Sequence, residues 1–236
     1  MPYNIPQMVN RFQIISFYEF KPLGPADRLA ELKTELTSAL LKHDVFGTIL
    51  VAEEGFNASL CGVPESIGTF LAAAEELLDT RITPKSSFSD KSPFRKHEVR
   101  IKPEIVTLKQ AVDISLGHGT HVDPKDWNQI ISDPEAFVLD TRNDYEFRSG
   151  TFEKAVNPNT VKFSDLPRFV EENLDPAKHK KIAMFCTGGV RCEKFAPFMK
   201  ARGFADVFQL RGGILQYLGD VPVDEQLWKG EWFVFE

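Results

Sequence analysis

The first half of the chain alternates short apolar strands with amphipathic helices. β-Branched and aromatic residues dominate the strand-like stretches, and leucines recur at helical spacing between them. Strands are expected at residues 12–20, 46–54 and 98–108, and helices at 24–44 and 64–80. A turn and a short return strand follow the second of these strands. This βαββαβ order predicts a ferredoxin-like domain over residues 10–110.

The second half has a different pattern, in which nearly continuous apolar strands alternate with helices. The strands are expected within AFVLDTR (136–142), KIAMFC (181–186) and DVFQL (206–210). Strands that are apolar on both faces are typical of a parallel sheet covered by helices on both sides. We therefore expect an α/β protein of two domains, in which the second domain spans residues 120–220.

A connector over residues 109–126 is expected to join the two domains. It contains Gly117, Gly119 and Pro124 and shows no clear periodicity, so we place the domain boundary there. Residues 221–236 follow the second domain and are expected to form a C-terminal tail.

Composition and charge argue against several classes of protein, namely strongly basic, disulfide-rich, secreted and membrane-spanning proteins. The 236 residues carry a formal net charge of −6, which argues against a strongly basic nucleic-acid binder but leaves room for a local basic patch. Three cysteines cannot build a disulfide framework and suit a reducing compartment. The N-terminus lacks the pattern of a secretion signal, and no run is apolar enough to span a bilayer. We expect a cytoplasmic protein with no membrane partner.

The strongest chemical signal is the stretch CTGGVRC, residues 186–192. Cys186 ends a predicted parallel strand, which is where open α/β sheets keep their chemistry. Gly188 and Gly189 let the loop curl so that backbone N–H groups point inward, and a helix begins near Arg191. These groups stabilise a thiolate, so we expect a lowered pKa and a nucleophilic role for Cys186. The rest of this candidate active-site loop is Thr187, Val190 and Cys192.

Other interpretations of the cysteines remain open. A zinc site is disfavoured because five residues separate Cys186 from Cys192 and no second pair of ligands is visible, so we predict no metal. We favour Cys192 as a small apolar helix residue, and a resolving thiol that forms a disulfide with Cys186 is the alternative. An inert Cys186 fits poorly with two glycines and an arginine in the same loop. Glu193 is expected to cap the helix.

The loop resembles that of rhodanese domains, whose cysteine accepts sulfur as a persulfide. Four residues separate its cysteine from its arginine, one fewer than in protein tyrosine phosphatases, and the smaller ring suits a sulfur atom better than a phosphate. Residues 138–158, VLDTRNDYEFRSGTFEKAVNP, and residues 206–218, DVFQLRGGILQYL, also resemble rhodanese segments. Within the first of these, Asp140 and Arg142 either brace the loop or form a structural salt bridge.

Motifs along both halves also resemble a narrower family, the bacterial rhodanese-domain tRNA uridine hydroxylases (TrhO). The resemblance runs from about Phe12 to Phe235. The motifs that carry it are AEEGFNASLCG, SPFRKHEVRIKPEIVTL, VDPKDWNQIISDP, LDTRNDYEFRSGTF, KKIAMFCTGGVRCEKFAPFM and VFQLRGGILQYL. The two motifs CTGGVRCEK and EIVTL together are a much more specific sign of this family than a rhodanese loop alone.

The resemblance implies a reaction and its participants. It implies an acylphosphatase-like N-terminal domain and an oxidoreductase of the monooxygenase type, which converts uridine 34 of tRNA to 5-hydroxyuridine. Cys186 is the residue that the resemblance makes catalytic, with Arg191 beside it. Molecular oxygen is implied as co-substrate, the reductant is not identified, and the sequence shows no metal or flavin motif. The implied partner is the anticodon region of tRNA.

The chain departs from the family pattern in three places. Gly55-Phe56-Asn57-Ala58-Ser59 stands where the family usually has Gly-Ile-Asn-Gly-Thr. Trp232 stands where many members have a cysteine. Many members continue into a cysteine-containing tail, so this chain is either a short member or lacks part of that tail.

Residues 85–102, KSSFSDKSPFRKHEVRIK, are locally basic in an acidic chain. Phe88 and Phe94 are interleaved with the cations, so the segment combines phosphate-binding charge with aromatic rings that stack on bases. The alternative is a solvated loop with two core phenylalanines. The expected RNA-binding residues are Lys91, Arg95, Lys96, Arg100 and Lys102.

Two other functions compete with the hydroxylase. One is a sulfurtransferase that carries a persulfide on Cys186 and takes its sulfur from thiosulfate or a sulfur-donor protein. The other is a rhodanese-like binding module without catalytic activity, which predicts that Cys186 reacts no faster than a free thiol.

Overall fold

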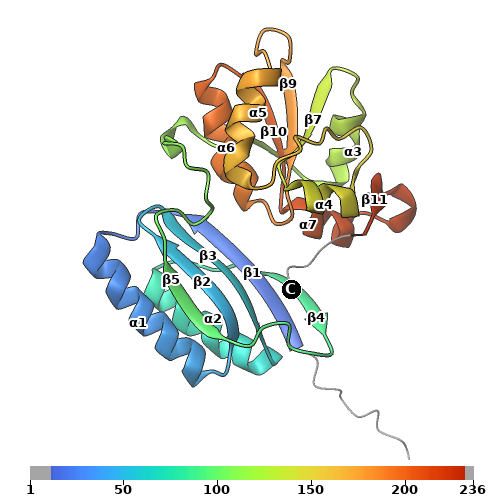
Figure 1. Cartoon of the computed structure of the whole chain (residues 1–236). Helices are drawn as coiled ribbons and strands as arrows, with labels where there is room; N and C mark the ends of the chain where they lie inside the picture. The colour runs from blue at the N-terminus through green and yellow to red at the C-terminus, as the bar shows by residue number, and fades with distance from the viewer. Residues whose placement is uncertain (1–11, 232–236) are drawn as a thin grey trace, which may run out of the picture. The chain divides into compact units, whose positions relative to one another are not determined.

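The computed structural model describes residues 12–231 and divides into two compact units. The first unit ends at Ile105 and the second begins at Val106. Each unit has its own sheet, helices and apolar core (Figure 1). The chain is therefore a two-domain α/β protein, as the change of pattern along the sequence predicts.

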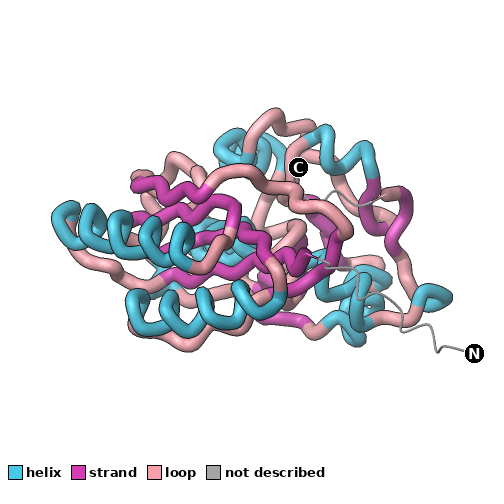
Figure 2. The backbone as a smooth tube through the Cα atoms, turned by 90° about the horizontal axis from the view of Figure 1, so that it is seen from below, coloured by secondary structure: helices cyan, strands magenta, loops and turns pink. Residues whose placement is uncertain are grey.

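The first domain is a five-stranded sheet with two helices packed on one face. Its strands are β1 (Phe12–Phe20), β2 (Phe46–Ala52), β3 (Gly55–Gly62), β4 (Lys85–Ser89) and β5 (His97–Ile101), in the order β4-β1-β3-β2-β5. Its helices are α1 (Ala26–Lys42) and α2 (Pro64–Leu78), which run side by side along the sheet (Figure 2). The ferredoxin-like fold is confirmed, with β5 added parallel to β2.

The alternation of apolar residues explains why the helices lie on one face. In β1, Ile15 and Phe17 are buried against the helices, whereas the residues between and beside them are partly exposed. Helix α1 contributes Leu32 and Leu36 to the same core, and α2 contributes Phe70. Removing this apolar surface from water, at roughly 25 cal/mol per Å², holds the helices on the sheet.

The last strands of this domain differ from the prediction of strands over 98–108. The fourth ferredoxin strand is β4, which pairs antiparallel with β1, and β5 ends at Ile101 on the opposite edge of the sheet. Pattern reading misses β4 because its sequence, KSSFS, has only one apolar residue. Edge strands are often polar because one side of the strand faces water.

The second domain is built around a parallel sheet in the order β6-β10-β9-β7. The four strands are β6 (Thr120–Val122), β7 (Ala136–Asp140), β9 (Lys181–Phe185) and β10 (Asp206–Leu210). The helices are α3 (Pro124–Ser132), α4 (Asp144–Ser149), α5 (Leu166–Asn173), α6 (Val190–Ala201) and α7 (Gly213–Asp220). Strands β8 (Gly150–Phe152) and β11 (Trp228–Gly230) form a separate antiparallel pair. Short 3-10 turns are η1 (Ile114–Leu116), η2 (Phe163–Asp165) and η3 (Val223–Glu225).

Both faces of this sheet are covered, as the continuous apolar strands predict. In β9, Ile182 and Met184 join one apolar cluster with residues of α5 and α6. Ala183 and Phe185 join a second cluster with residues of α3 and α7, among them the fully buried Trp127. This arrangement brings the carboxyl end of β9, and therefore Cys186, between the two layers of helices.

The division between the domains lies earlier than the predicted connector over residues 109–126. Val106 already belongs to the second domain, where its carbonyl accepts a hydrogen bond from Lys194 Nζ at 3.2 Å. Leu108 is fully buried in the same apolar cluster as α6. The predicted connector itself contains β6 and the first residues of α3. Its strand was missed because three residues are too few to show a periodicity.

The predicted tail over residues 221–236 is also part of the second domain as far as the structure describes it. Val221 is buried, and β11 pairs with β8 through Trp228 and Phe152. The departure from the family at Trp232 lies outside the described residues. Among residues 12–231, no helix has the length and apolar character needed to cross a membrane.

Candidate active site

The loop after β9 wraps its backbone N–H groups around the Cys186 sulfur. Gly189 has a φ of +100°, in the left-handed region that glycine adopts without strain, and its N–H donates a hydrogen bond to Cys186 Sγ at 3.0 Å. The N–H groups of Arg191 and Cys192, in the first turn of α6, donate to the same sulfur. The loop therefore has the inward-pointing donors that the sequence predicts.

These donors change the acidity of the thiol. Burial raises the pKa of Cys186, but the hydrogen bond from the Cys192 thiol, the charge of Arg191 and the two helix N–H groups outweigh it. The pKa is lowered from 9.0 to about 6. Cys186 is consequently a thiolate at neutral pH, the form in which cysteine attacks electrophiles.

A direct titration checks this state. The ultraviolet absorbance of the thiolate, taken as the difference between the parent chain and Cys186→Ala, is expected to rise with a midpoint near pH 6. Because the folded pKa lies below the ordinary 9.0, the thiolate stabilises the fold fully above that pH, and this contribution is lost as the pH falls through about 6. A midpoint near 9 in the folded protein would contradict the proposed geometry.

Glu146, on α4, is the partner of Arg191 and was not among the site residues that the sequence suggests. The guanidinium binds both carboxylate oxygens, at 2.8 and 2.9 Å, and Glu146 is 2% exposed. Burial raises the pKa of Glu146, but the hydrogen bond and charge of Arg191 outweigh this and lower it. The Thr187 hydroxyl donates to the same carboxylate at 3.3 Å. Glu146 therefore fixes both ends of the loop.

A sequence signal for Glu146 exists but points to a different role. Asn143 and Glu146 have the spacing of a capping box, and the Asn143 N–H donates to Glu146 Oε2 at 3.1 Å. From the sequence alone, this pattern marks the start of α4. Only the fold reveals that the capping carboxylate also binds Arg191.

The second glycine pair in the sequence closes the loop from the side of α7. The N–H groups of Ile214 and Leu215 donate to the carbonyls of Cys186 and Thr187, at 3.0 and 3.2 Å. Gly213 has a φ of +68°, and a Cβ there would lie 2.5 Å from both carbonyl oxygens. Glycine is therefore required at this position because α7 approaches the loop backbone so closely.

Asp140 and Arg142 form a buried ion pair, and the charge of Asp140 also acts on Arg191 of the Cys186 loop. Arg142 binds both Asp140 oxygens, at 2.9 and 2.6 Å, and donates to the carbonyl of Gly150 at 2.6 Å. Its guanidinium also lies 5.1 Å from the ring centre of Trp228. The pair therefore joins β7 to β8 and β11.

The predicted RNA-binding cations are all exposed in the first domain, and they are spread from just after β4 to the opposite edge of the sheet. Phe88 lies on edge strand β4, whereas Arg100 lies on β5 at the opposite edge. Arg100 is paired with Glu98 at 2.7 Å. The exposed cations on β5 and on the segments that flank it are Lys91, Arg95, Lys96, Arg100 and Lys102.

Glu193 does not cap α6 but lies between two histidines. Its oxygens are 2.8 Å from His118 Nδ1 and 3.0 Å from His121 Nε2, and Gln209 Nε2 donates to it at 2.6 Å. The tertiary fold brings these histidines to one carboxylate, although they look scattered in the sequence. Within residues 12–231, no group of three or more His, Cys, Asp or Glu side chains is arranged to hold a metal ion.

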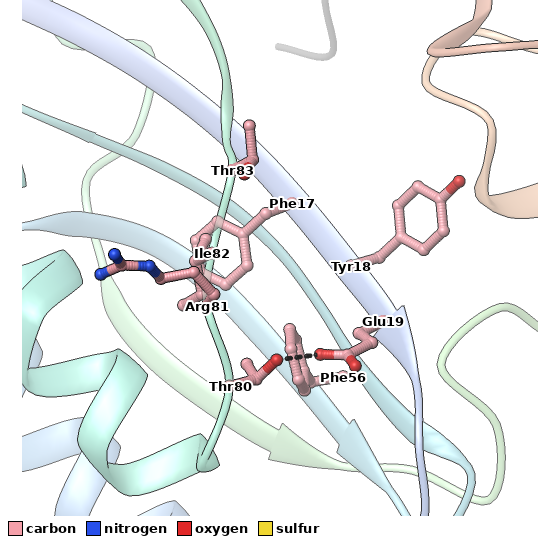
Figure 3. A pocket seen from close by; sticks show the side chains of 8 residues that line it. All are labelled: Phe17, Tyr18, Glu19, Phe56, Thr80, Arg81, Ile82 and Thr83. Atoms are coloured by element: carbon pink, nitrogen blue, oxygen red, sulfur yellow. Dashed lines mark hydrogen bonds between the residues drawn. The ribbon is translucent and has the colours of Figure 1, made fainter.

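A separate, shallow pocket of about 260 Å³ lies in the first domain (Figure 3). Phe17 and Phe56 line one side, and the segment 80–83 lines the other. The Thr80 hydroxyl donates to Glu19 Oε2 at 2.7 Å across the pocket. None of the residues that line it belongs to the Cys186 loop.

Comparisons with known proteins agree with both domains. A family model for the UPF0176 acylphosphatase-like domain matches residues 12–105, and one for the rhodanese-like domain matches residues 123–220. Together the two matches span most of the chain.

Several solved structures are similar to one domain or the other. The rhodanese-like domain of an Anabaena protein is 17% identical, with 47% of this chain and 79% of that chain covered and a TM-score of 0.39. A rhodanese-related protein from Thermoplasma volcanium is 22% identical, with coverage of 43% and 92% and a TM-score of 0.34. An acylphosphatase from Coxiella burnetii is 14% identical, with coverage of 39% and 94% and a TM-score of 0.30.

Proposed function

We propose that this chain, which belongs to the TrhO/UPF0176 family by its pair of domains, hydroxylates the wobble uridine of tRNA to 5-hydroxyuridine. The observation that carries the proposal is the Cys186 thiolate, held by loop and helix N–H groups and by Arg191. A nucleophile of this kind in a rhodanese-like domain, joined to an acylphosphatase-like domain with exposed cations, suits a reaction on a nucleic acid.

The thiolate has a specific chemical task in the proposed reaction. Addition of Cys186 to C6 of uracil would raise the electron density at C5, the carbon that receives oxygen. Molecular oxygen is the proposed co-substrate, and a Cys186 persulfide is the alternative participant. Trapping of a covalent Cys186–RNA adduct during turnover would favour addition to C6, and its absence would favour the persulfide.

The test of the function is a measurement on cellular tRNA. Cells that lack their own hydroxylase would express this chain, and 5-hydroxyuridine in digested tRNA would be quantified by mass spectrometry. The nucleoside is expected to appear only in cells that express the chain. Its absence there, with the folded chain present, would contradict the proposed reaction.

Binding of tRNA is proposed to use the exposed cations around β5. Replacing Arg95, Lys96 and Arg100 with alanine is expected to weaken tRNA binding. Each cation that contacts a phosphate displaces counterions from the RNA, and this contribution to binding is lost with the cation. The slope of log affinity against log salt should flatten by about 2 when all three contact phosphates. Binding titrations at several salt concentrations measure both effects.

A matched variant separates this effect from a general loss of charge. Lys33, Lys42 and Arg81 are exposed cations of the same domain that lie outside the segment 85–102. Replacing these three with alanine is expected to leave the salt slope unchanged. Equal losses in both variants would show that the segment around β5 has no special role.

A sulfurtransferase is the second candidate, and one observation favours it. Cys186 is only 1% exposed, so a small sulfur donor reaches its sulfur with less rearrangement than a nucleobase does. Sulfur transfer from thiosulfate to cyanide by the purified chain, measured as thiocyanate, tests this activity. No thiocyanate above the level of Cys186→Ala would exclude thiosulfate as the donor.

A further inference from the structure

The Cys186 loop contains a second thiol that the proposed reaction does not use. Cys192 lies in the first turn of α6 and, like Cys186, is 1% exposed. Its thiol donates a hydrogen bond to the Cys186 sulfur. The two sulfur atoms are therefore in direct contact. They need to approach each other only a little further to reach the S–S bond length of about 2.05 Å.

The two thiols are in different protonation states. Burial raises the pKa of Cys192, and the neighbouring Cys186 raises it further. Since Cys186 is the thiolate, the pair holds one proton at neutral pH, and this proton is on Cys192. The lower-pKa sulfur is the one that attacks first, and the protonated sulfur stays in reserve beside it.

Thr141 packs against the Cys192 sulfur. Its hydroxyl donates to the carbonyl of Phe185 at 2.9 Å, and the same oxygen lies in contact with Cys192 Sγ at 3.5 Å. Thr141 is fully buried directly after β7, and its backbone N–H donates to the same carbonyl at 3.1 Å. The Cys192 sulfur therefore contacts both Cys186 and Thr141, the residue that follows the neighbouring strand β7.

We propose that Cys192 is an internal acceptor that discharges a persulfide from Cys186 as hydrosulfide. The inference rests on the sulfur-carrying activity given above as the second candidate. Cys192 already touches the sulfur that would carry the persulfide, so this acceptor is in place without a second molecule entering the loop. The activity that results is release of sulfide from a sulfane-sulfur donor such as thiosulfate.

The chemistry balances in two steps. The Cys186 thiolate attacks the outer sulfur of thiosulfate, whose S–S bond breaks, and sulfite leaves with the electron pair. The Cys192 sulfur then attacks the inner sulfur of the Cys186 persulfide. The persulfide bond breaks, and the outer sulfur leaves with the electron pair and the Cys192 proton as hydrosulfide. The two thiols are oxidised to a Cys186–Cys192 disulfide as the sulfane sulfur is reduced to sulfide, and an added dithiol reduces this disulfide before a further turnover.

A single-turnover experiment with thiosulfate tests the inference on the full chain. The parent chain is expected to release sulfide in an amount equal to the chain and to lose two hydrogens in mass. Cys192→Ser is expected to release none and to keep one added sulfur on Cys186. Cys61→Ser, which removes the third thiol from the other domain, should behave as the parent chain.

The outcomes distinguish this inference from the activity on which it rests. A stable persulfide in both the parent chain and Cys192→Ser would overturn the role of Cys192 and leave sulfur acceptance intact. No sulfide from the parent chain together with no added sulfur on Cys192→Ser would overturn both. Independently, equilibration in glutathione redox buffers followed by peptide mapping should find a Cys186–Cys192 disulfide, and its absence at the oxidising end would overturn the inference whatever the sulfur donor.

Discussion

Replacing Cys186 with alanine is expected to abolish 5-hydroxyuridine in the tRNA of cells that depend on this chain. The substitution removes the thiolate that the loop N–H groups and Arg191 stabilise, and no other described side chain occupies its position. Alanine is smaller than cysteine, and Arg191 keeps its bidentate pair with Glu146, so the fold should persist. The expected level of the nucleoside is that of cells without the chain.

Cys61→Ala is the matched control for the loss of a thiol. Cys61 is buried in the first domain, and burial raises its pKa, so it is a packing residue rather than a nucleophile. Cells with this variant should contain as much 5-hydroxyuridine as cells with the parent chain. If Cys186→Ala retains the parent level, Cys186 takes no part in the reaction and the proposed mechanism is wrong.

Replacing Glu146 with alanine is expected to cost the second domain about 3–5 kcal/mol of unfolding free energy. The reason is that the Arg191 guanidinium, whose side chain is 10% exposed, would keep its charge and lose the carboxylate that it binds through two hydrogen bonds. The Thr187 hydroxyl and the Asn143 N–H would lose the same acceptor. Glu146→Gln keeps the shape and one acceptor oxygen, so its loss should be smaller.

Urea unfolding followed by tryptophan fluorescence measures this change in the appropriate domain. All three tryptophans, Trp127, Trp228 and Trp232, follow residue 106 in the sequence, so the signal reports on the second domain. The double variant with Arg191→Ala provides the control. Because it leaves no buried charge unpaired, it should be more stable than the sum of the two single changes predicts. Strict additivity would mean that the two residues do not act as a pair.

Much of the fold follows from local patterns. The amphipathic helices, the alternating strand β1 and the doubly buried strand β9 have clear periodicities, and the structure contains each of them near its predicted position. The errors concern short or polar elements. Strand β4 is a polar edge strand, β6 has three residues, and the segment that follows Ile105 is packed onto α6 by tertiary contacts that no periodicity reveals.

The candidate site divides in the same way. Cys186, Gly189 and Arg191 lie within one short loop, so their cooperation is local. The sequence by itself determined the loop and its rhodanese-like character, and it identified Cys186 as the candidate nucleophile. Only the tertiary structure decided which carboxylate neutralises Arg191, because Glu146 lies 45 residues away and looks like a helix cap.

The same holds for the parts of the site that depend on close approach. Gly213 must be glycine because α7 packs against the loop carbonyls. Cys192 touches Cys186 because the first turn of α6 lies next to the carboxyl end of β9. A sequence records which residues favour a helix, a strand or a turn, since those preferences arise between near neighbours. Contacts between distant segments depend on how the buried faces pack, and the packing of the whole domain therefore decided the partners of the nucleophile.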